Sequence, residues 1–179
     1  MAGAGRDVVG PMVLAAWDSF CAQAAAVDLH RPTRLPGWRV QEVCVHLGVW
    51  PGHAALDDLI GSARTGASGP APDVDAVNAR VTAAHRDAPR AEVLAALQRN
   101  REATVRYLAD EPVGLDTAPA VSTVGRLPRL SVVLGQAYEL AVHGLDLAAA
   151  GAPEVPPAVL QSGLAALADV TGALAAAGG

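Results

Sequence analysis

Alanine fills 39 of the chain's 179 positions, over a fifth of the sequence. Alanine is the residue that most favours an α-helix, whereas the β-branched residues that favour strands are not dominant in this chain. Only 3% of the residues are aromatic, although 51% are hydrophobic. The sequence therefore predicts an all-α fold, and the hydrophobic content is too high for a disordered chain.

Proline, glycine and polar residues divide the chain into helical segments. We expect helices over Val8–Ala26, Arg39–Ile60, Asp73–Arg86, Arg90–Ala109 and Leu130–Ala150, and a last helix that begins at Pro156 or Pro157 and ends near Ala176. The first has apolar residues at helical spacing, and Asp73 can act as the N-cap of the third. This order predicts an antiparallel four-helix bundle with an additional C-terminal helix, forming one domain over residues 1–179.

Three interruptions qualify this pattern. Pro51 and Gly52 lie inside the second segment and predict a kink near Trp50. Gly61–Pro72 is rich in glycine, serine and proline and is expected to be a flexible connection. Glu111–Pro128 is expected to be an unusually long irregular loop, and covering a site is one role for such a loop.

Charge and cysteine content exclude several functions. The net charge is −5 without a basic cluster, which argues against nucleic-acid binding, and all 13 basic residues are arginine. The absence of lysine excludes Schiff-base chemistry and a P-loop. Cys21 and Cys44 form no disulfide framework. Charged residues interrupt the apolar N-terminal stretch and the alanine-rich C-terminal stretch, so we expect a soluble cytoplasmic protein without signal peptide or membrane span.

A carboxylate and an imidazole stand four residues apart in the segment 130–150. Glu139 and His143 therefore share one face of the predicted helix, in apolar surroundings where such groups are costly unless paired or metal-bound. Glu42 and His46 have the same spacing, but Glu42 lies at a helix start, where glutamate is favoured for structural reasons. His46 lies among apolar residues. One histidine from one helix and a Glu–His pair from another would supply the three protein ligands of a catalytic zinc site.

Two segments resemble a known family. LPGWRVQEVCVHL (35–47) is similar to a helix start of the DinB-like bundle superfamily, and ELAVHGLDLAAAG (139–151) resembles a helix of the mycothiol-dependent, maleylpyruvate isomerase-like branch. The resemblance extends over most of residues 8–175. It implies a DinB-like bundle that holds a divalent metal through His46, Glu139 and His143, with zinc expected and nickel as an alternative. It also implies a low-molecular-weight thiol, such as mycothiol, as cosubstrate.

Three departures from the family pattern bear on the activity. Leu145 replaces the usual tryptophan of the later motif, and Arg39 replaces the usual capping threonine or serine. Isomerases of this group carry a second domain after the bundle, whereas only 28 residues follow Gly151. The departures weaken the expectation of maleylpyruvate isomerisation more than that of a metal-centred thiol role.

Four further residues are candidates for the same site. Asp146 lies three residues after His143, where it could orient a ligand or act as a catalytic base, or simply pair with an arginine. Gln136, His53 and Trp50 are candidate cofactor-binding residues, because their spacing from the ligands places them toward the site or on the pocket wall.

Two functions follow. The first is a metal-dependent transferase or isomerase in which the thiol attacks a small electrophilic substrate. The alternative is a non-catalytic metal-binding bundle that binds a small molecule or a protein. A fourth protein ligand would favour the alternative, whereas an open coordination position would favour catalysis. We expect no nucleic-acid or membrane partner, and the sequence does not decide between a monomer and a homodimer.

Overall fold

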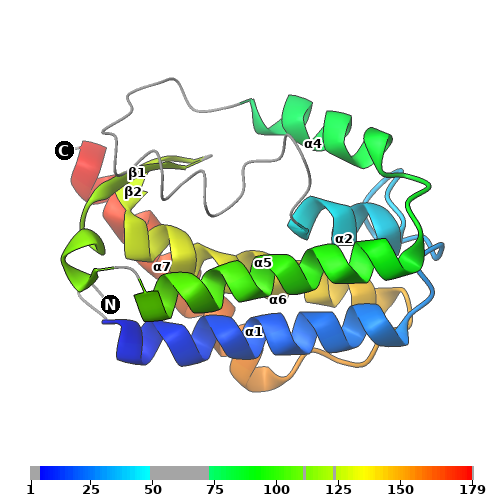
Figure 1. Ribbon diagram of the computed structural model, residues 1–179, viewed down its shortest axis with the longest axis horizontal. Helices are drawn as coiled ribbons and strands as arrows, with labels where there is room; N and C mark the ends of the chain where they lie inside the picture. The colour runs from blue at the N-terminus through cyan, green and yellow to red at the C-terminus, as the bar shows by residue number, and fades with distance from the viewer. Residues whose placement is uncertain (1–4, 49–72, 111, 123, 179) are drawn as a thin grey trace.

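The computed structural model describes residues 5–48, 73–110, 112–122 and 124–178, and it is predominantly helical (Figure 1). Its elements are α1 (Arg6–Ala26), α2 (Val40–Leu47), α4 (Val74–Ala84), α5 (Arg90–Asp110), η1 (Val113–Leu115), β1 (Pro119–Ser122), β2 (Gly125–Pro128), α6 (Arg129–Ala149) and α7 (Pro157–Gly178). The predicted all-α bundle is confirmed, and α7 is the additional C-terminal helix.

Helix α1 packs against both α5 and α6, α2 packs against α5 and α6, and α7 packs mainly on α6 (Figure 1). On α1, the predicted apolar face is buried at Val13, Trp17 and Phe20. Leu97 of α5 and Leu134 of α6 are buried in the same core. Burial of this stripe, more than helix propensity, stabilises the bundle.

Two predicted helix starts have the expected chemistry. The Asp73 Oδ1 atom accepts a hydrogen bond of 3.0 Å from the Ala76 backbone N–H, which confirms Asp73 as the N-cap of α4. At the start of α2, the carboxylate of Glu42 accepts a 2.9 Å hydrogen bond from the Arg39 backbone N–H. Glu42 also forms a 2.8 Å ion pair with the Arg39 guanidinium. Glu42 thereby stabilises the start of α2, because the N-cap residue Arg39 has no side-chain hydroxyl that could accept a hydrogen bond from the first turn.

The second predicted helix is shorter than expected. Helix α2 ends at Leu47, because Gly48 has an extended backbone and its N–H closes the last turn on the carbonyls of Cys44 and Val45. The prediction that this helix continues without a break past Leu47 is therefore wrong, whereas the predicted kink near Trp50 is not tested. Trp50, Pro51 and the remainder of the predicted segment lie outside the described residues.

The segment 111–128 is not the irregular loop that the sequence suggested. It contains the 3₁₀ turn η1 and an antiparallel hairpin in which Ala120 pairs with Leu127 and Ser122 pairs with Gly125. Both members of the first pair are buried, and β2 packs beside α7. Each strand has only four residues, and each begins or ends at a proline. The alternation of apolar and polar residues is therefore too short to predict a strand from the sequence.

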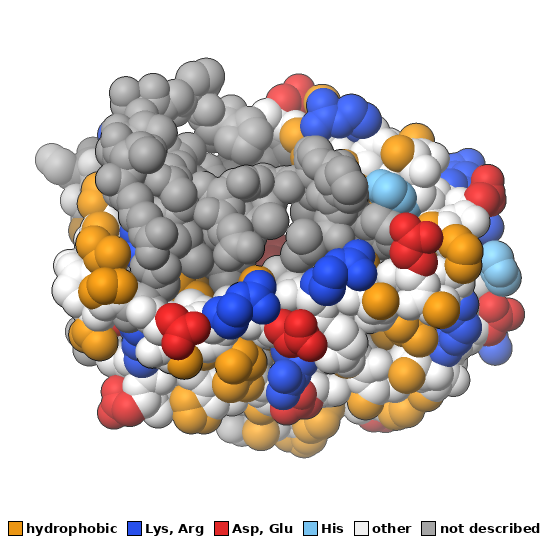
Figure 2. All heavy atoms as spheres, viewed as in Figure 1, with side chains coloured by type: hydrophobic (Ala, Val, Ile, Leu, Met, Phe, Trp, Pro, Cys, Tyr) orange, Lys and Arg blue, Asp and Glu red, His pale blue; other side chains and the backbone are white. Residues whose placement is uncertain are grey.

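Charged side chains are mixed on the face shown in Figure 2. Where α5 crosses this view, arginine and acidic side chains stand beside one another, so this part of the described surface has no patch of a single sign. Separately, α1 and the segment Pro157–Ala177 are long and apolar enough to cross a bilayer. Length and composition alone do not separate such a span from a helix that packs in a protein core, as α1 does.

Gly163 sets the close approach of α7 to α6. A Cβ atom at this position would lie 2.7 Å from the Ala141 Cβ and 3.3 Å from the Ala137 carbonyl oxygen. We expect Gly163→Ala to lower the free energy of unfolding by about 1–3 kcal/mol, because the two helices would have to separate. Gly172 on the same helix has open space around its Cβ position, so Gly172→Ala should raise stability by up to about 1 kcal/mol. Urea unfolding of both variants tests this, and equal shifts would contradict it.

Candidate metal site

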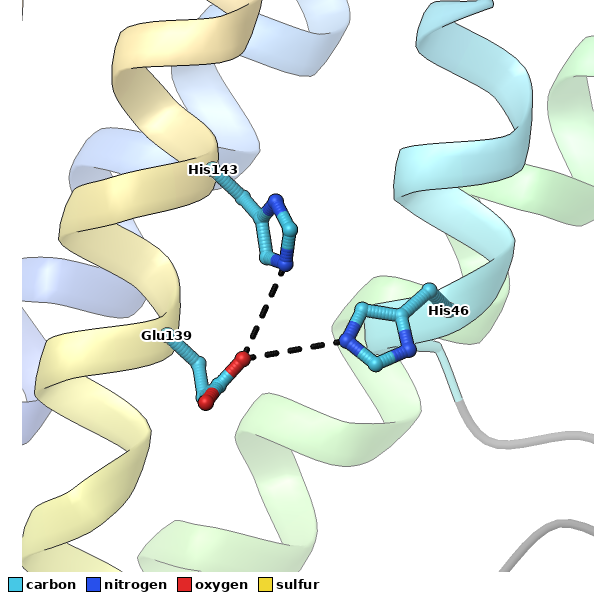
Figure 3. A group of neighbouring side chains, drawn as sticks. All are labelled: His46, Glu139 and His143. Carbon is cyan, nitrogen blue, oxygen red and sulfur yellow. Dashed lines mark ion pairs between the residues drawn. The ribbon is translucent and has the colours of Figure 1, made fainter. Parts of the chain in front are cut away.

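Three predicted ligands from two helices face one another (Figure 3). His46 is on α2, and Glu139 and His143 are one turn apart on α6. The Nε2 atoms of both histidines lie 3.7 Å from the same oxygen, Oε2 of Glu139. The ligand atoms of all three residues lie within 4.8 Å of one another. The bundle thus brings together residues that are almost a hundred positions apart in the sequence.

These separations fit the donor set of a metal ion. A distance of 3.7 Å is too long for a hydrogen bond. It is close to the spacing of about 3.3 Å between ligands around a tetrahedral zinc ion with bonds of 2.0–2.1 Å. Two imidazole nitrogens and one carboxylate oxygen are typical zinc ligands, and three protein ligands leave one coordination position for water or substrate. The residues therefore fit a catalytic type of metal site.

A hydrogen bond to Asn78 of α4 fixes the orientation of the His46 ring. The Nδ1 atom of His46 lies 3.0 Å from the amide oxygen of Asn78, so we assign the proton to Nδ1 and the lone pair to Nε2, which faces Glu139. The ring also makes an edge contact with Trp38, at 5.7 Å between centroids. Sequence reasoning missed Asn78, because nothing in the sequence links a polar residue of α4 to a histidine 32 positions earlier.

The orientation of His143 is set by a buried carboxylate. Its Nδ1 atom donates to Asp146 Oδ2 at 3.0 Å, which leaves the Nε2 lone pair toward Glu139. The side chain of Asp146 is only 4% exposed, and its other oxygen accepts a 2.9 Å hydrogen bond from Arg34. Asp146 thus hydrogen-bonds to His143 and pairs with an arginine, which are two of the three roles considered from the sequence; the third, a catalytic base, stays a prediction. Arg34 was missed because it lies in the irregular segment between α1 and α2.

The protonation states suit metal binding. Interaction with His46 is the main cause that holds the pKa of Glu139 below its ordinary value, and burial opposes this shift. Burial, reinforced by His46, lowers the pKa of His143, while the hydrogen bond to Asp146 acts in the opposite direction. At neutral pH Glu139 is therefore ionised and His143 is neutral, the forms that ligate a divalent metal.

The remaining candidates occupy different environments. The Gln136 side-chain oxygen accepts hydrogen bonds from Trp17 Nε1 at 2.7 Å and from Thr104 Oγ1 at 2.9 Å, one turn from Glu139. Trp50 and His53 lie outside the described residues. Glu42 is engaged at the helix start described above and is not part of the group of ligands.

Comparison with known proteins gives the same fold and a family. Two crystal structures match: a mycothiol-dependent maleylpyruvate isomerase in which one histidine is replaced by alanine (TM-score 0.67, 16% identity), and the mycothiol-dependent maleylpyruvate isomerase itself (TM-score 0.63, 18% identity). Each match covers 89% of this chain and 70% of the other. No curated protein matches. Residues 13–148 match the family described as mycothiol maleylpyruvate isomerase N-terminal domain, and the chain therefore belongs to this family.

Proposed function

We propose that this chain is a metal-dependent, thiol-using enzyme domain that acts on a small electrophile. In this proposal His46, Glu139 and His143 hold a divalent ion, with zinc expected, and a low-molecular-weight thiol such as mycothiol is the cosubstrate. The observation that carries the proposal is the convergence of three ligand atoms, with both imidazoles oriented from behind by Asn78 and Asp146. Membership of the mycothiol maleylpyruvate isomerase family supports the choice of thiol.

The protein's own cysteines are poorly suited to supply the nucleophile. Burial raises the pKa of Cys21 to about 11, and burial raises the pKa of Cys44 still further. Both thiols are therefore protonated at neutral pH, and only a thiolate is a strong nucleophile. An external thiol needs the same activation, and a bound divalent ion favours the thiolate form of a coordinated thiol.

The proposed reaction is an addition of the thiol to an electrophilic carbon. The thiol loses its S–H proton to solvent, and the sulfur electron pair forms a C–S bond to the electrophilic carbon, while the π bond at that carbon breaks and its electron pair moves into the electron-withdrawing group of the substrate. In an isomerisation the C–S bond later breaks, the π bond re-forms and the thiolate takes up a proton from solvent. In a transfer the adduct itself takes up that proton, and the C–S bond persists in the product. The three ligands and their supporting partners hold the site in one geometry throughout, which limits reorganisation during the reaction.

Cobalt substitution tests this function directly. We expect the cobalt-loaded protein to develop an intense near-ultraviolet sulfur-to-metal charge-transfer band when mycothiol is added, because the sulfur occupies the open coordination position. The S-methylated thiol is the control, since its sulfur cannot become a thiolate. An unchanged spectrum at saturating mycothiol would overturn the thiol-dependent function, and the alternative of a non-catalytic metal-binding module would then explain the site better.

A further inference from the structure

A cavity lies outside the metal site, at the end of the bundle where α1 ends and α5 begins (Figure 1). Its volume of about 400 Å³ is within the range of pockets that bind small molecules. Gln41 of α2 lines the cavity and precedes His46 by five residues, which is about 7.5 Å along the helix axis and a different face of the helix. The three candidate metal ligands are not among the residues that line it. The cavity is therefore a second feature, distinct from the metal site.

One wall of the cavity carries a buried amide whose orientation is fixed. Gln41 is only 2% exposed. Its Nε2 atom donates to three backbone carbonyls of the turn between α4 and α5, those of His85, Arg86 and Ala88, at 3.1, 2.7 and 3.1 Å. Because a carbonyl oxygen can only accept, rotating the amide would place Oε1 against three acceptors. The Oε1 atom receives no hydrogen bond from the described residues and keeps access to solvent, so it is left as an acceptor for a ligand.

Negative charge and acceptor oxygens dominate the cavity. The exposed carboxylates of Asp28 and Asp87 line it together with one guanidinium, that of Arg90. Arg90 already donates to three carbonyls at the end of α1, at 2.6–3.2 Å, where it offsets the negative end of the helix dipole. Arg39 interacts with Asp87 through charge alone, because its own ion pair is with Glu42. The cavity therefore favours a cation over an anion.

A metal ion does not fit this cavity. Within the described ranges, the ligand atoms of histidine, cysteine and carboxylate side chains converge to within 4.8 Å only at the candidate metal site. Asp28, Asp87 and the His30 ring, which also lines the cavity, are therefore too far apart to hold one ion together. A larger cation that carries its own hydrogen-bond donors suits these separated acceptors better.

An ammonium group has this chemistry, because it combines a positive charge with three N–H donors and has no acceptor. Leu29 and Ala88 line the same cavity and offer apolar contact to an aliphatic chain. We infer that the cavity binds a small aliphatic amine in its ammonium form, which donates to Gln41 Oε1 and to the carboxylates of Asp28 and Asp87. This inference is independent of the proposed function, since it uses none of the candidate metal ligands.

Three probes with the same butyl chain separate charge from hydrogen bonding. n-Butylammonium has charge and N–H donors, butyltrimethylammonium has charge alone, and 1-butanol is neutral. Each is titrated into nitrogen-15-labelled wild-type protein and followed by the amide chemical shifts of Leu29, Gln41 and Ala88. We expect n-butylammonium to bind at least about 10-fold more tightly than 1-butanol and about fivefold more tightly than butyltrimethylammonium, because both controls lose charge-assisted hydrogen bonds. Equal binding of the two ammonium probes, or shifts confined to the metal ligands, would overturn the inference.

Two substitutions then test the carboxylates. Asp28→Asn and Asp87→Asn remove the charge but keep the size and an acceptor oxygen, so each should weaken n-butylammonium binding about threefold or more. Asp75→Asn is the matched control and should leave binding unchanged, since this exposed residue in the first turn of α4 lies at the opposite end of that helix from the cavity. Gln41 stays unchanged because its Nε2 holds the turn between α4 and α5, and the trimethylated probe tests its oxygen instead. Equal affinities in the three variants would overturn the site, because only the net charge would then attract the amine.

Discussion

Replacing His143 with alanine is expected to weaken zinc binding by more than about 100-fold, since loss of partners that only orient a ligand already costs 10- to 100-fold. The substitution removes one of three ligand atoms, and Glu139 loses one of its two facing imidazoles. Asp146 also loses the Nδ1–H donor that it accepts from. Competition with a chelating dye on metal-free protein, with and without the substitution, measures the zinc affinity directly.

The chain contains its own control for this experiment. Glu42 and His46 repeat the four-residue spacing of Glu139 and His143, but the Glu42 carboxylate is buried and bonded to Arg39. We expect Glu42→Gln to leave zinc affinity within about threefold of wild type and instead to lower the free energy of unfolding by about 1–3 kcal/mol. Equal losses of zinc affinity in the two variants would show that the wrong carboxylate had been assigned to the metal.

Most of the helices, and the pair of candidate ligands on α6, were predictable for local reasons. Apolar periodicity and helix-end residues depend on neighbours within one or two turns, and Asp73 acts as the N-cap that its position suggested. Glu139 and His143 were recognisable as candidate ligands because their four-residue spacing places them on one face of a helix. Joining that pair to His46 needed the family resemblance as well, because spacing alone carries no information on which helix faces which.

Of the groups that support the candidate ligands, Asp146 was considered from the sequence, whereas Asn78 and Arg34 were not predictable from it. Asn78 reaches His46 only because α4 packs against α2, and Arg34 reaches Asp146 from an irregular segment. The bond between Trp17 and Gln136 joins residues 119 positions apart. Contacts of this kind depend on tertiary packing, whereas periodicity reports only which face of an element is apolar.

The hairpin at residues 119–128 is a backbone feature that also depends on tertiary packing and could not be predicted from the sequence. The sequence offered proline, glycine and no long apolar alternation, which is typical of an irregular loop. The structure orders this region through Asp116, whose backbone carbonyl accepts a 3.0 Å hydrogen bond from the Leu130 N–H, and through buried Ala120 and Leu127. Asp116, which accepts hydrogen bonds from Arg6, Tyr107 and the Leu130 backbone, therefore helps to order a segment that the sequence suggested was irregular.

Asp116→Ala is expected to be the most destabilising substitution considered, lowering the free energy of unfolding by about 3–5 kcal/mol. The Asp116 carboxylate is 10% exposed and pairs with Arg6 at 2.6 Å, and it accepts a 2.8 Å hydrogen bond from the Tyr107 hydroxyl. Alanine would remove the carboxylate to which the largely buried Arg6 guanidinium and the buried Tyr107 hydroxyl both donate. A chain of this size should then melt roughly 6–20 °C lower, as measured by thermal unfolding of the metal-free protein.

Asp18→Ala provides the matched comparison, because it breaks an ion pair of nearly the same length in a different environment. Asp18 pairs with Arg101 at 2.7 Å, but its side chain is 61% exposed, so water solvates both charges when the pair is broken. We expect a loss of at most about 1 kcal/mol for Asp18→Ala. If the two substitutions cost the same, the carboxylate of Asp116 does not hold the N-terminal end of α1 to α5, and hydrophobic burial of the hairpin must order the region instead.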